Sequence, residues 1–159
     1  MKNGEVYYSD LKWRRRPIQQ WRTVHHWMDK GYIKGSRTPY TGKIYELHEN
    51  GQKRFELNIK DGIADGLIVV WFENGQKMSE SNYKDGEPVG QWLQWYDNGQ
   101  KFFEHNFKDG YAVGVWTWWH ADGQKWREEH YMYEGILQSE LYWNRKGEPV
   151  DSEEEALEQ

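Results

Sequence analysis

Apolar and polar positions recur along most of this chain with a period of 24 residues. Asn-Gly-Gln-Lys occurs at 50–53, 74–77 and 98–101, and Asp-Gly-Gln-Lys occurs at 122–125. Lys-Asp-Gly recurs between them, at 60–62, 84–86 and 108–110. The intervening segments have the length of strands and are rich in aromatic and β-branched residues. The pattern predicts an all-β protein, an antiparallel up-and-down meander of tandem 24-residue β-hairpin repeats.

The two turn motifs predict how neighbouring strands pair. Asn-Gly between strands is the strongest short hairpin signal, because a type I′ turn requires positive φ at both central residues. We therefore expect a two-residue type I′ turn at each Asn-Gly and a looser return at each Lys-Asp-Gly, which a further glycine follows. With this register, tryptophans face apolar residues of the next strand: Trp71 with Met78, Trp95 with Phe102, and Trp119 with Trp126.

Strand alternation then divides the side chains between two faces. One face carries a column of tryptophans and a column of glutamates. On the other face, Val70 pairs with Ser79, Trp92 with His105 and Trp116 with Glu129. Because both faces carry apolar groups, neither resembles a clean core. We expect an open, twisted, mostly single-layer sheet with an aromatic stripe on each face.

The flanking segments lack the repeat and differ in charge. Residues 1–40 form a basic N-terminal cap segment of net charge +6, in which Pro17 to Lys30 is a predicted helix. The repeat array spans 41–147, and 148–159 is an acidic C-terminal tail that we expect to be frayed. The rest of the chain beyond residue 40 carries −11, for a total of −5. This asymmetry bears on partners rather than on the fold.

Composition narrows the class of protein further. Aromatic residues make up 17% of the chain while only 36% is hydrophobic, which favours a thin structure covered by large flat side chains. The absence of cysteine excludes disulfides and thiolate metal sites. No apolar run approaches the roughly 20 residues of a membrane span, and the first residues lack the apolar core of a signal peptide. We therefore expect a cytoplasmic protein.

The repeating unit also resembles a known family. Asn-Gly-Gln-Lys, a following Glu, Asn-(Tyr/Phe)-Lys-Asp-Gly and a further Gly together resemble the variant MORN repeat over about residues 29–147. Proteins dominated by this repeat are often grouped as YwqK-type antitoxins in bacteria, and the lead-in at 30–43 is similar to how those proteins enter their first repeat. The chain departs from the pattern in a one-residue slip near Gly135, a basic run at 12–16 and its many tryptophans.

Chemistry-bearing residues give little support to an enzyme. Glu56, Glu80, Glu104 and Glu128 would lie two strands apart, about 9–10 Å, which is too far to share a metal. The six histidines form no spaced metal motif, and the chain shows neither a nucleophile signature nor a phosphate loop. We expect no catalytic residue, no metal and no cofactor.

We therefore expect a non-enzymatic protein-interaction module, which the family resemblance implies is a bacterial antitoxin or immunity-type partner. A basic toxin or effector would dock on the face that mixes aromatic anchors with carboxylates. The predicted interface residues are Trp71, Trp95, Trp119, Trp143, Met78, Phe102, Trp126, Glu80, Glu104 and Glu128.

Two other classes remain open. Trp- and Tyr-rich hairpins also build aromatic cages, so a carbohydrate- or choline-type ligand-binding protein is one alternative. Open sheet edges also allow a structural protein that self-associates edge to edge. Nucleic acid is disfavoured, because the acidic body would repel its backbone although Arg14-Arg15-Arg16 is basic.

Overall fold

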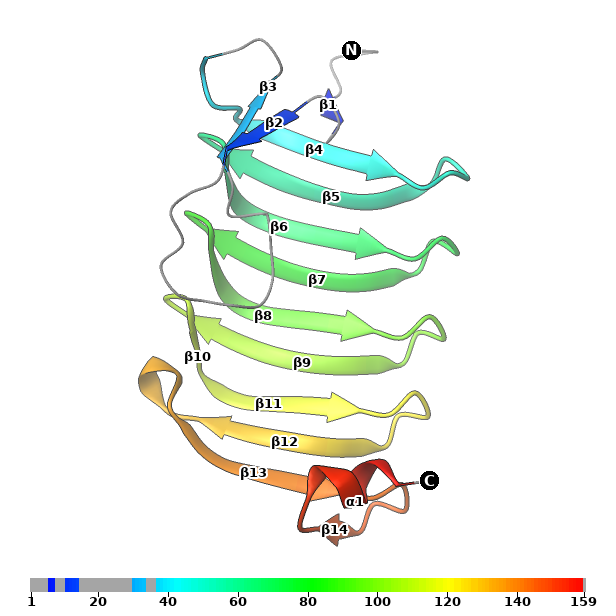
Figure 1. Ribbon diagram of the computed structural model, residues 1–159. Helices are drawn as coiled ribbons and strands as arrows, with labels where there is room; N and C mark the ends of the chain where they lie inside the picture. The colour runs from blue at the N-terminus through cyan, green and yellow to red at the C-terminus, as the bar shows by residue number, and fades with distance from the viewer. Residues whose placement is uncertain (1–5, 8–10, 15–29, 34–36, 159) are drawn as a thin grey trace.

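The computed structural model describes residues 6–7, 11–14, 30–33 and 37–158. Its main feature is a 12-stranded sheet in which consecutive strands are neighbours (Figure 1). A separate two-stranded sheet is formed by β2 and β3. The strands are β1 (Val6–Tyr7), β2 (Leu11–Arg14), β3 (Lys30–Ile33), β4 (Gly42–Leu47), β5 (Lys53–Lys60), β6 (Ile63–Trp71), β7 (Lys77–Lys84), β8 (Glu87–Trp95), β9 (Lys101–Lys108), β10 (Tyr111–Ala112), β11 (Gly114–Trp119), β12 (Lys125–Tyr131), β13 (Leu137–Trp143) and β14 (Pro149–Val150).

The predicted antiparallel up-and-down meander is confirmed. Every pair from β4 to β14 is antiparallel, and only β1 joins β4 in parallel. The inner pairs of each hairpin also have the predicted register, as Val69 with Glu80 and Trp92 with His105 show. The hairpins stack side by side as an open sheet, because each strand completes its hydrogen bonds with both sequence neighbours (Figure 1).

The Asn-Gly turns differ from the prediction. Gly75 N–H donates to Phe72 O at 3.0 Å, and Phe72 N–H donates to Gln76 O at 2.9 Å. Gly75 has φ +83°, whereas Asn74 is not among the residues with positive φ. Three residues therefore separate the strands, in the form of a turn that ends in a left-handed glycine and a bulge. The predicted type I′ turn at Asn-Gly was wrong.

The bulge changes the outermost pair of each hairpin. Trp71 pairs with Lys77, and the later repeats pair Trp95 with Lys101 and Trp119 with Lys125. The predicted partners Met78, Phe102 and Trp126 are the extra residues of the bulges. The predicted tryptophan–apolar pairs were therefore wrong by one position on the second strand.

The tight turn lies instead at Lys-Asp-Gly. Asp61 and Gly62 have φ values of +50° and +81°, and Asp85 and Gly86 have +50° and +86°. Positive φ at both central residues is the signature of type I′, and aspartate tolerates it better than most side chains. The flanking residues pair directly across the turn, as Lys60 does with Ile63. The turn types of the two motifs are thus the reverse of the expected ones.

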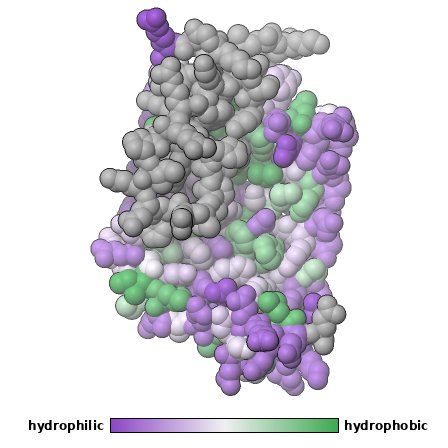
Figure 2. All heavy atoms as spheres, viewed as in Figure 1, coloured by the Kyte–Doolittle hydropathy of each residue, from purple (hydrophilic) through white to green (hydrophobic). Residues whose placement is uncertain are grey.

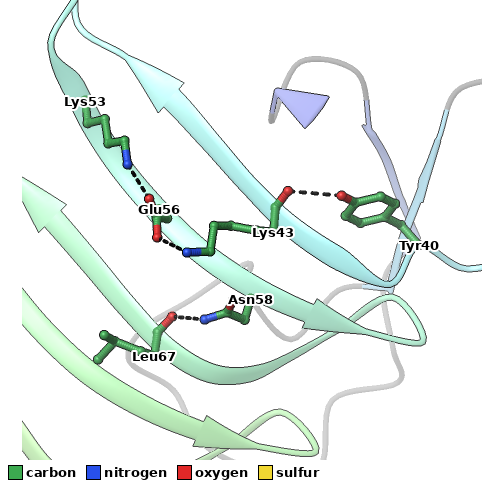
Figure 3. Close-up of polar contacts among 6 residues, drawn as sticks. All are labelled: Tyr40, Lys43, Lys53, Glu56, Asn58 and Leu67. Carbon is green, nitrogen blue, oxygen red and sulfur yellow. Dashed lines mark hydrogen bonds and ion pairs between the residues drawn. The ribbon is translucent and has the colours of Figure 1, made fainter. Parts of the chain in front are cut away.

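Each tight turn is followed by a bend in the next strand. The ribbon curves sharply near the start of β6 and β8 and between β10 and β11 (Figure 1). The bends coincide with Gly66 at φ +105°, Gly90 at +72° and Gly114 at +68°. Asn58 Nδ2 donates to Leu67 O at 2.9 Å across the first bend, which satisfies a carbonyl that the disrupted ladder leaves open (Figure 3). The sheet is curved as a result.

One face holds a hydrophobic core over β4–β7, so the expectation that neither face is a clean core was wrong. Ile44, Leu57 and Ile68 align across three strands and are 0%, 0% and 4% exposed. The cluster consists of Ile44, Phe55, Leu57, Ile59, Ala64, Ile68 and Tyr83. Farther along the array, the same face carries aromatic side chains in place of aliphatic ones.

The predictions for the two segments that flank the repeats have different outcomes. The predicted helix from Pro17 to Lys30 lies outside the described residues except for Lys30, which begins β3. The C-terminal tail is ordered where we expected fraying: α1 (Glu153–Leu157) buries Ala156 completely. Ser152 Oγ caps this helix by accepting from Glu155 N–H at 3.2 Å. Within the described part of the chain, no helix has the length and hydropathy needed to cross a bilayer.

Candidate functional site

The tryptophan and glutamate columns share one face of the sheet, which we call the ladder face. Lysines connect the two columns. Lys53 Nζ lies 2.5 Å from Glu56 Oε2 in its own strand and 5.8 Å from the Trp71 ring centre in the next strand. Equivalent contacts join Lys101 to Glu104 and Trp119, and Lys125 to Glu128 and Trp143. Three of the four repeats thus present a lysine between a carboxylate and an indole ring, and in the remaining one Lys77 pairs with Glu80.

The glutamates of the ladder face are ion-paired. Figure 3 shows Lys43 and Lys53 converging on Glu56, at 2.6 and 2.5 Å. Hydrogen bonds from Lys43 and Lys53 lower the pKa of Glu56 below its usual value, although its partial burial opposes the shift. Burial raises the pKa of Glu128, but the bonds from Lys125 and His130 outweigh it and leave the pKa lowered. The ladder face therefore pairs its charges instead of presenting bare carboxylates.

Exposed acidic side chains gather at the neighbouring turns. Glu49, Glu73, Asp97 and Asp122 are exposed and occupy the stacked Asn-Gly or Asp-Gly turns that follow β4, β6, β8 and β11. We call these four residues the turn ridge. The ridge borders the tryptophan column, because Trp71 and Trp95 lie two residues before Glu73 and Asp97. An acidic edge thus runs beside the row of indoles.

Asparagine side chains hold the turn ridge together. Asn50 Nδ2 donates to Glu73 O at 2.9 Å, and Asn98 Nδ2 donates to Ala121 O at 2.7 Å. The same side chain accepts from its own turn, as Asn98 Oδ1 does from Gln100 N–H at 2.9 Å. Sequence reasoning missed this role. The available signal was the asparagine column at 50, 74 and 98, which was assigned to turn conformation alone.

Three predicted interface residues separate from the tryptophan column. The Phe102 ring lies 5.0 Å from that of Tyr96 and 5.5 Å from that of Phe103. Trp126 is 9% exposed, and its ring centre lies 6.5 Å from that of Trp118. Phe102 and Trp126 therefore pack with side chains of the opposite face, and Met78 is half-buried at the equivalent bulge. The seven others, in the tryptophan and glutamate columns, are brought together on the ladder face.

The opposite face carries a packed aromatic cluster over β9–β13. His105 stacks between Phe103 and Trp116, with ring centres 4.1 and 3.9 Å away. Burial, assisted by the positive charge of Arg127, lowers the pKa of His105 to about 3, so this imidazole is neutral at physiological pH. Arg127 lies over the Trp118 ring at 4.9 Å and pairs with Glu129. The cluster is held by ring stacking and by the Arg127–Glu129 pair, while His105 Nε2 and Arg127 Nε are buried without a hydrogen-bond partner in the described part of the chain.

Histidines and acids do not assemble a metal centre in the described part of the chain, where no group of three His, Asp or Glu side chains converges. His48 instead braces the next hairpin, because its Nε2 lies 2.9 Å from Trp71 O. Tyr96 occupies the equivalent column position and donates to Trp119 O at 2.9 Å. These side chains are part of the inter-repeat contacts and not of a reactive site.

Comparison with known proteins gives one result. Three consecutive segments, 64–85, 88–109 and 112–132, match the family model described as the MORN repeat variant. Neither the curated proteins nor the solved structures give a significant match. Each matched segment begins just after a tight turn and contains one complete three-residue turn; the first two end at the next tight turn, and the third ends at the longer connection between β12 and β13. The chain therefore carries variant MORN repeats at three consecutive positions, within a longer sheet of the same construction.

Proposed function

We propose that this chain is a non-enzymatic protein-interaction module that recognises its partner through the ladder face. The observation that carries the proposal is the row of half-buried indoles at Trp71, Trp95, Trp119 and Trp143, held in register by the sheet. Indoles on a rigid surface lose little conformational entropy on binding and commonly supply the largest share of binding energy. A repeated module of this kind also matches the interaction roles usual for MORN repeats.

The charge pattern favours a basic partner. Lysine–glutamate pairs make the ladder face nearly neutral, so the attraction does not come from the glutamate column as sequence reasoning assumed. The turn ridge supplies it instead, with exposed carboxylates at Glu49, Glu73, Asp97 and Asp122 beside the indoles. A partner whose apolar groups lie on the indoles would place its lysines and arginines against this edge.

An antitoxin or immunity role is the biological form of this proposal. In that role the chain would cover the functional surface of a basic toxin or effector by rigid docking, without chemistry of its own. A curved sheet whose hairpins are fixed by inter-repeat hydrogen bonds suits rigid docking, because little ordering entropy is lost when the complex forms.

The test is comparative affinity capture from extract of the cells that produce the chain. Immobilised wild-type protein is compared with Trp95→Ala, Glu104→Lys and Gln76→Ala, after circular dichroism confirms that each variant keeps its β signature. Trp95→Ala removes an indole, and Glu104→Lys leaves Lys101 unpaired and adds a second cation. Gln76 is exposed in a turn and is the control.

We expect the wild type and Gln76→Ala to enrich the same basic protein, and the other two variants to lose it. If all four baits enrich it equally, recognition lies away from the ladder face. For the antitoxin role, the captured protein should arrest growth when produced alone and be harmless when produced with this chain. A captured protein that is harmless alone would contradict that role while leaving the interaction itself in place.

A further inference from the structure

The connection between β12 and β13 differs from the three earlier turns at Lys-Asp-Gly. In those turns two residues, Asp and Gly, lie between the strands, whereas five residues, 132–136, lie between β12 and β13. Met132 N–H donates to Ile136 O at 2.8 Å, which closes a loop containing the single-turn helix η3 (Tyr133–Gly135). Glu134 at φ +66° and Gly135 at φ +74° supply the left-handed residues of the turn.

This longer turn exposes apolar side chains where the other turns expose Lys and Asp. Met132, Tyr133 and Ile136 are 49%, 66% and 55% exposed. Tyr111 and Leu137, at 42% each, adjoin the turn, because a Cβ added at Gly135 would lie 3.8 Å from the Tyr111 ring. We call these five residues the turn patch, and Figure 2 shows a hydrophobic area at the position of this turn. A contiguous exposed apolar patch of this kind marks a contact surface.

The neighbouring strand is equally uncovered. All five residues from Leu137 to Leu141 in β13 are exposed, whereas inner strands such as β5 alternate between buried and exposed positions. Beyond β13, the sheet continues only as β14, which pairs with Tyr142 and Trp143. The strand edge from Leu137 to Leu141 therefore has no neighbour among the described strands. The turn patch lies at the open end of the array, where a repeat protein requires a cap.

We propose that the turn patch is a self-association surface, on which a second copy of this chain docks by two-fold symmetry. Charge favours this location for two copies that each carry −5. The acidic helix α1, with Glu153, Glu154 and Glu155, lies at the far end of β13, and the five residues of the turn patch carry no charge, so two copies that meet at the patch keep these acidic helices away from the contact (Figure 1). In a two-fold contact, the apolar residues of the patch meet their own equivalents.

A membrane is the competing occupant of an exposed apolar loop, and the local charge disfavours it. Binding of an anionic bilayer requires basic residues beside the apolar ones. The charged residues beside the turn patch are Glu134 in the same turn, Lys108 and Asp109 in the adjacent β9–β10 turn, and Glu87, whose carboxylate lies against Gly110; together they sum to −2. None of the five residues of the turn patch belongs to the tryptophan or glutamate columns of the ladder face. A dimer formed by the turn patch therefore leaves the ladder face free.

The test is the mass of the purified full chain by sedimentation equilibrium over a wide range of concentrations. We expect a concentration-dependent rise from the monomer mass of 19.3 kDa toward twice that value. Tyr133→Lys and Ile136→Lys should each abolish the rise while far-ultraviolet circular dichroism stays unchanged. Leu67→Lys is the matched control, since Leu67 is a 39% exposed apolar residue inside the array, and it should dimerise like the wild type.

Three outcomes would overturn the proposal. The wild type could stay monomeric at every concentration, or dimers could persist in both turn-patch variants. The third is a monomer that sediments with phosphatidylcholine vesicles and loses this binding in Tyr133→Lys and Ile136→Lys. Because the measurement uses this chain alone, its failure is independent of the partner-capture experiment on the ladder face.

Discussion

At the residue scale, the sign of φ determines how each hairpin is built. Asp61, Asp85 and Asp109 adopt positive φ and make two-residue turns, whereas the asparagines of the Asn-Gly pairs do not. Sequence alone could not separate these cases, because Asn-Gly and Asp-Gly are equally good signals for type I′. The residue before glycine does not decide the turn either, because Asp122-Gly123 forms the same three-residue turn as the Asn-Gly pairs. Asparagine differs in having an N–H group that reaches the next turn.

Gly99 provides a test of backbone strain alone. It has φ +84°, and a Cβ added there would meet only Gln76 Nε2, at 4.0 Å. Gly99→Val should therefore lower the free energy of unfolding by about 1–3 kcal/mol, because a β-branched residue is strained at this φ. Gln76→Ala should change it by less than about 0.5 kcal/mol. Urea unfolding of both variants checks this, and an unchanged Gly99→Val would contradict the turn assignment.

His105 predicts how stability depends on pH. Its pKa is about 3 in the folded protein and 6.5 when unperturbed, so below pH 6.5 the unfolded chain binds a proton that the folded chain does not. Stability should therefore fall as the pH is lowered from 6.5 toward 3, by up to about 1.4 kcal/mol per pH unit from this group.

His105→Phe should reduce this dependence, because phenylalanine keeps the stacking between Phe103 and Trp116 but does not titrate. Denaturant midpoints of both proteins between about pH 7 and pH 5 provide the comparison, in a window above the titration range of most carboxyl groups. If the midpoints of the two proteins depend equally on pH, folding does not lower the pKa of His105.

At the element scale, neighbouring hairpins are joined by strand pairing and by side chains that reach from one turn to the next. The strands, their order and the inner register could be predicted from the 24-residue period, because strand alternation leaves few other pairings. The bulges could not, since one extra residue leaves no mark in the spacing of the repeats. Because of these bulges, Phe102 and Trp126 of the predicted interface pack on the opposite face and not beside the tryptophan column.

Asn98→Asp isolates the bond between turns. The variant keeps the acceptor for Gln100 N–H, as Asp122 does naturally for Gln124 N–H, but loses the donor to Ala121 O. We expect a loss of about 1 kcal/mol in unfolding free energy, typical of one hydrogen bond. Asn74→Asp should cost less, because its bond to Asp97 O is longer, at 3.3 Å. If Asn98→Asp and the wild type unfold at the same temperature, the hydrogen bond between the turns does not stabilise the protein.

At the scale of the whole molecule, the sheet presents two unlike faces and, among the described strands, an uncovered edge at β13. The tryptophan and glutamate columns of the ladder face could be predicted from the sequence, because equal spacing in stacked hairpins places residues in one row. The lysine bridges and the turn ridge could not, since they depend on side chains that reach across strands. The ordered C-terminal helix also depends on tertiary contact, namely the burial of Ala156.

The most direct test of the central claim is a series of dissociation constants for the purified partner, measured by calorimetry with Trp71→Ala, Trp95→Ala, Trp119→Ala and Trp143→Ala. Tyr133→Ala is the control, because it removes an aromatic side chain that is 66% exposed and lies away from the ladder face. We predict that at least two neighbouring column variants weaken binding about tenfold or more, which corresponds to about 1.4 kcal/mol each, while Tyr133→Ala binds normally. Four folded column variants that all bind as tightly as the wild type would contradict recognition by the ladder face.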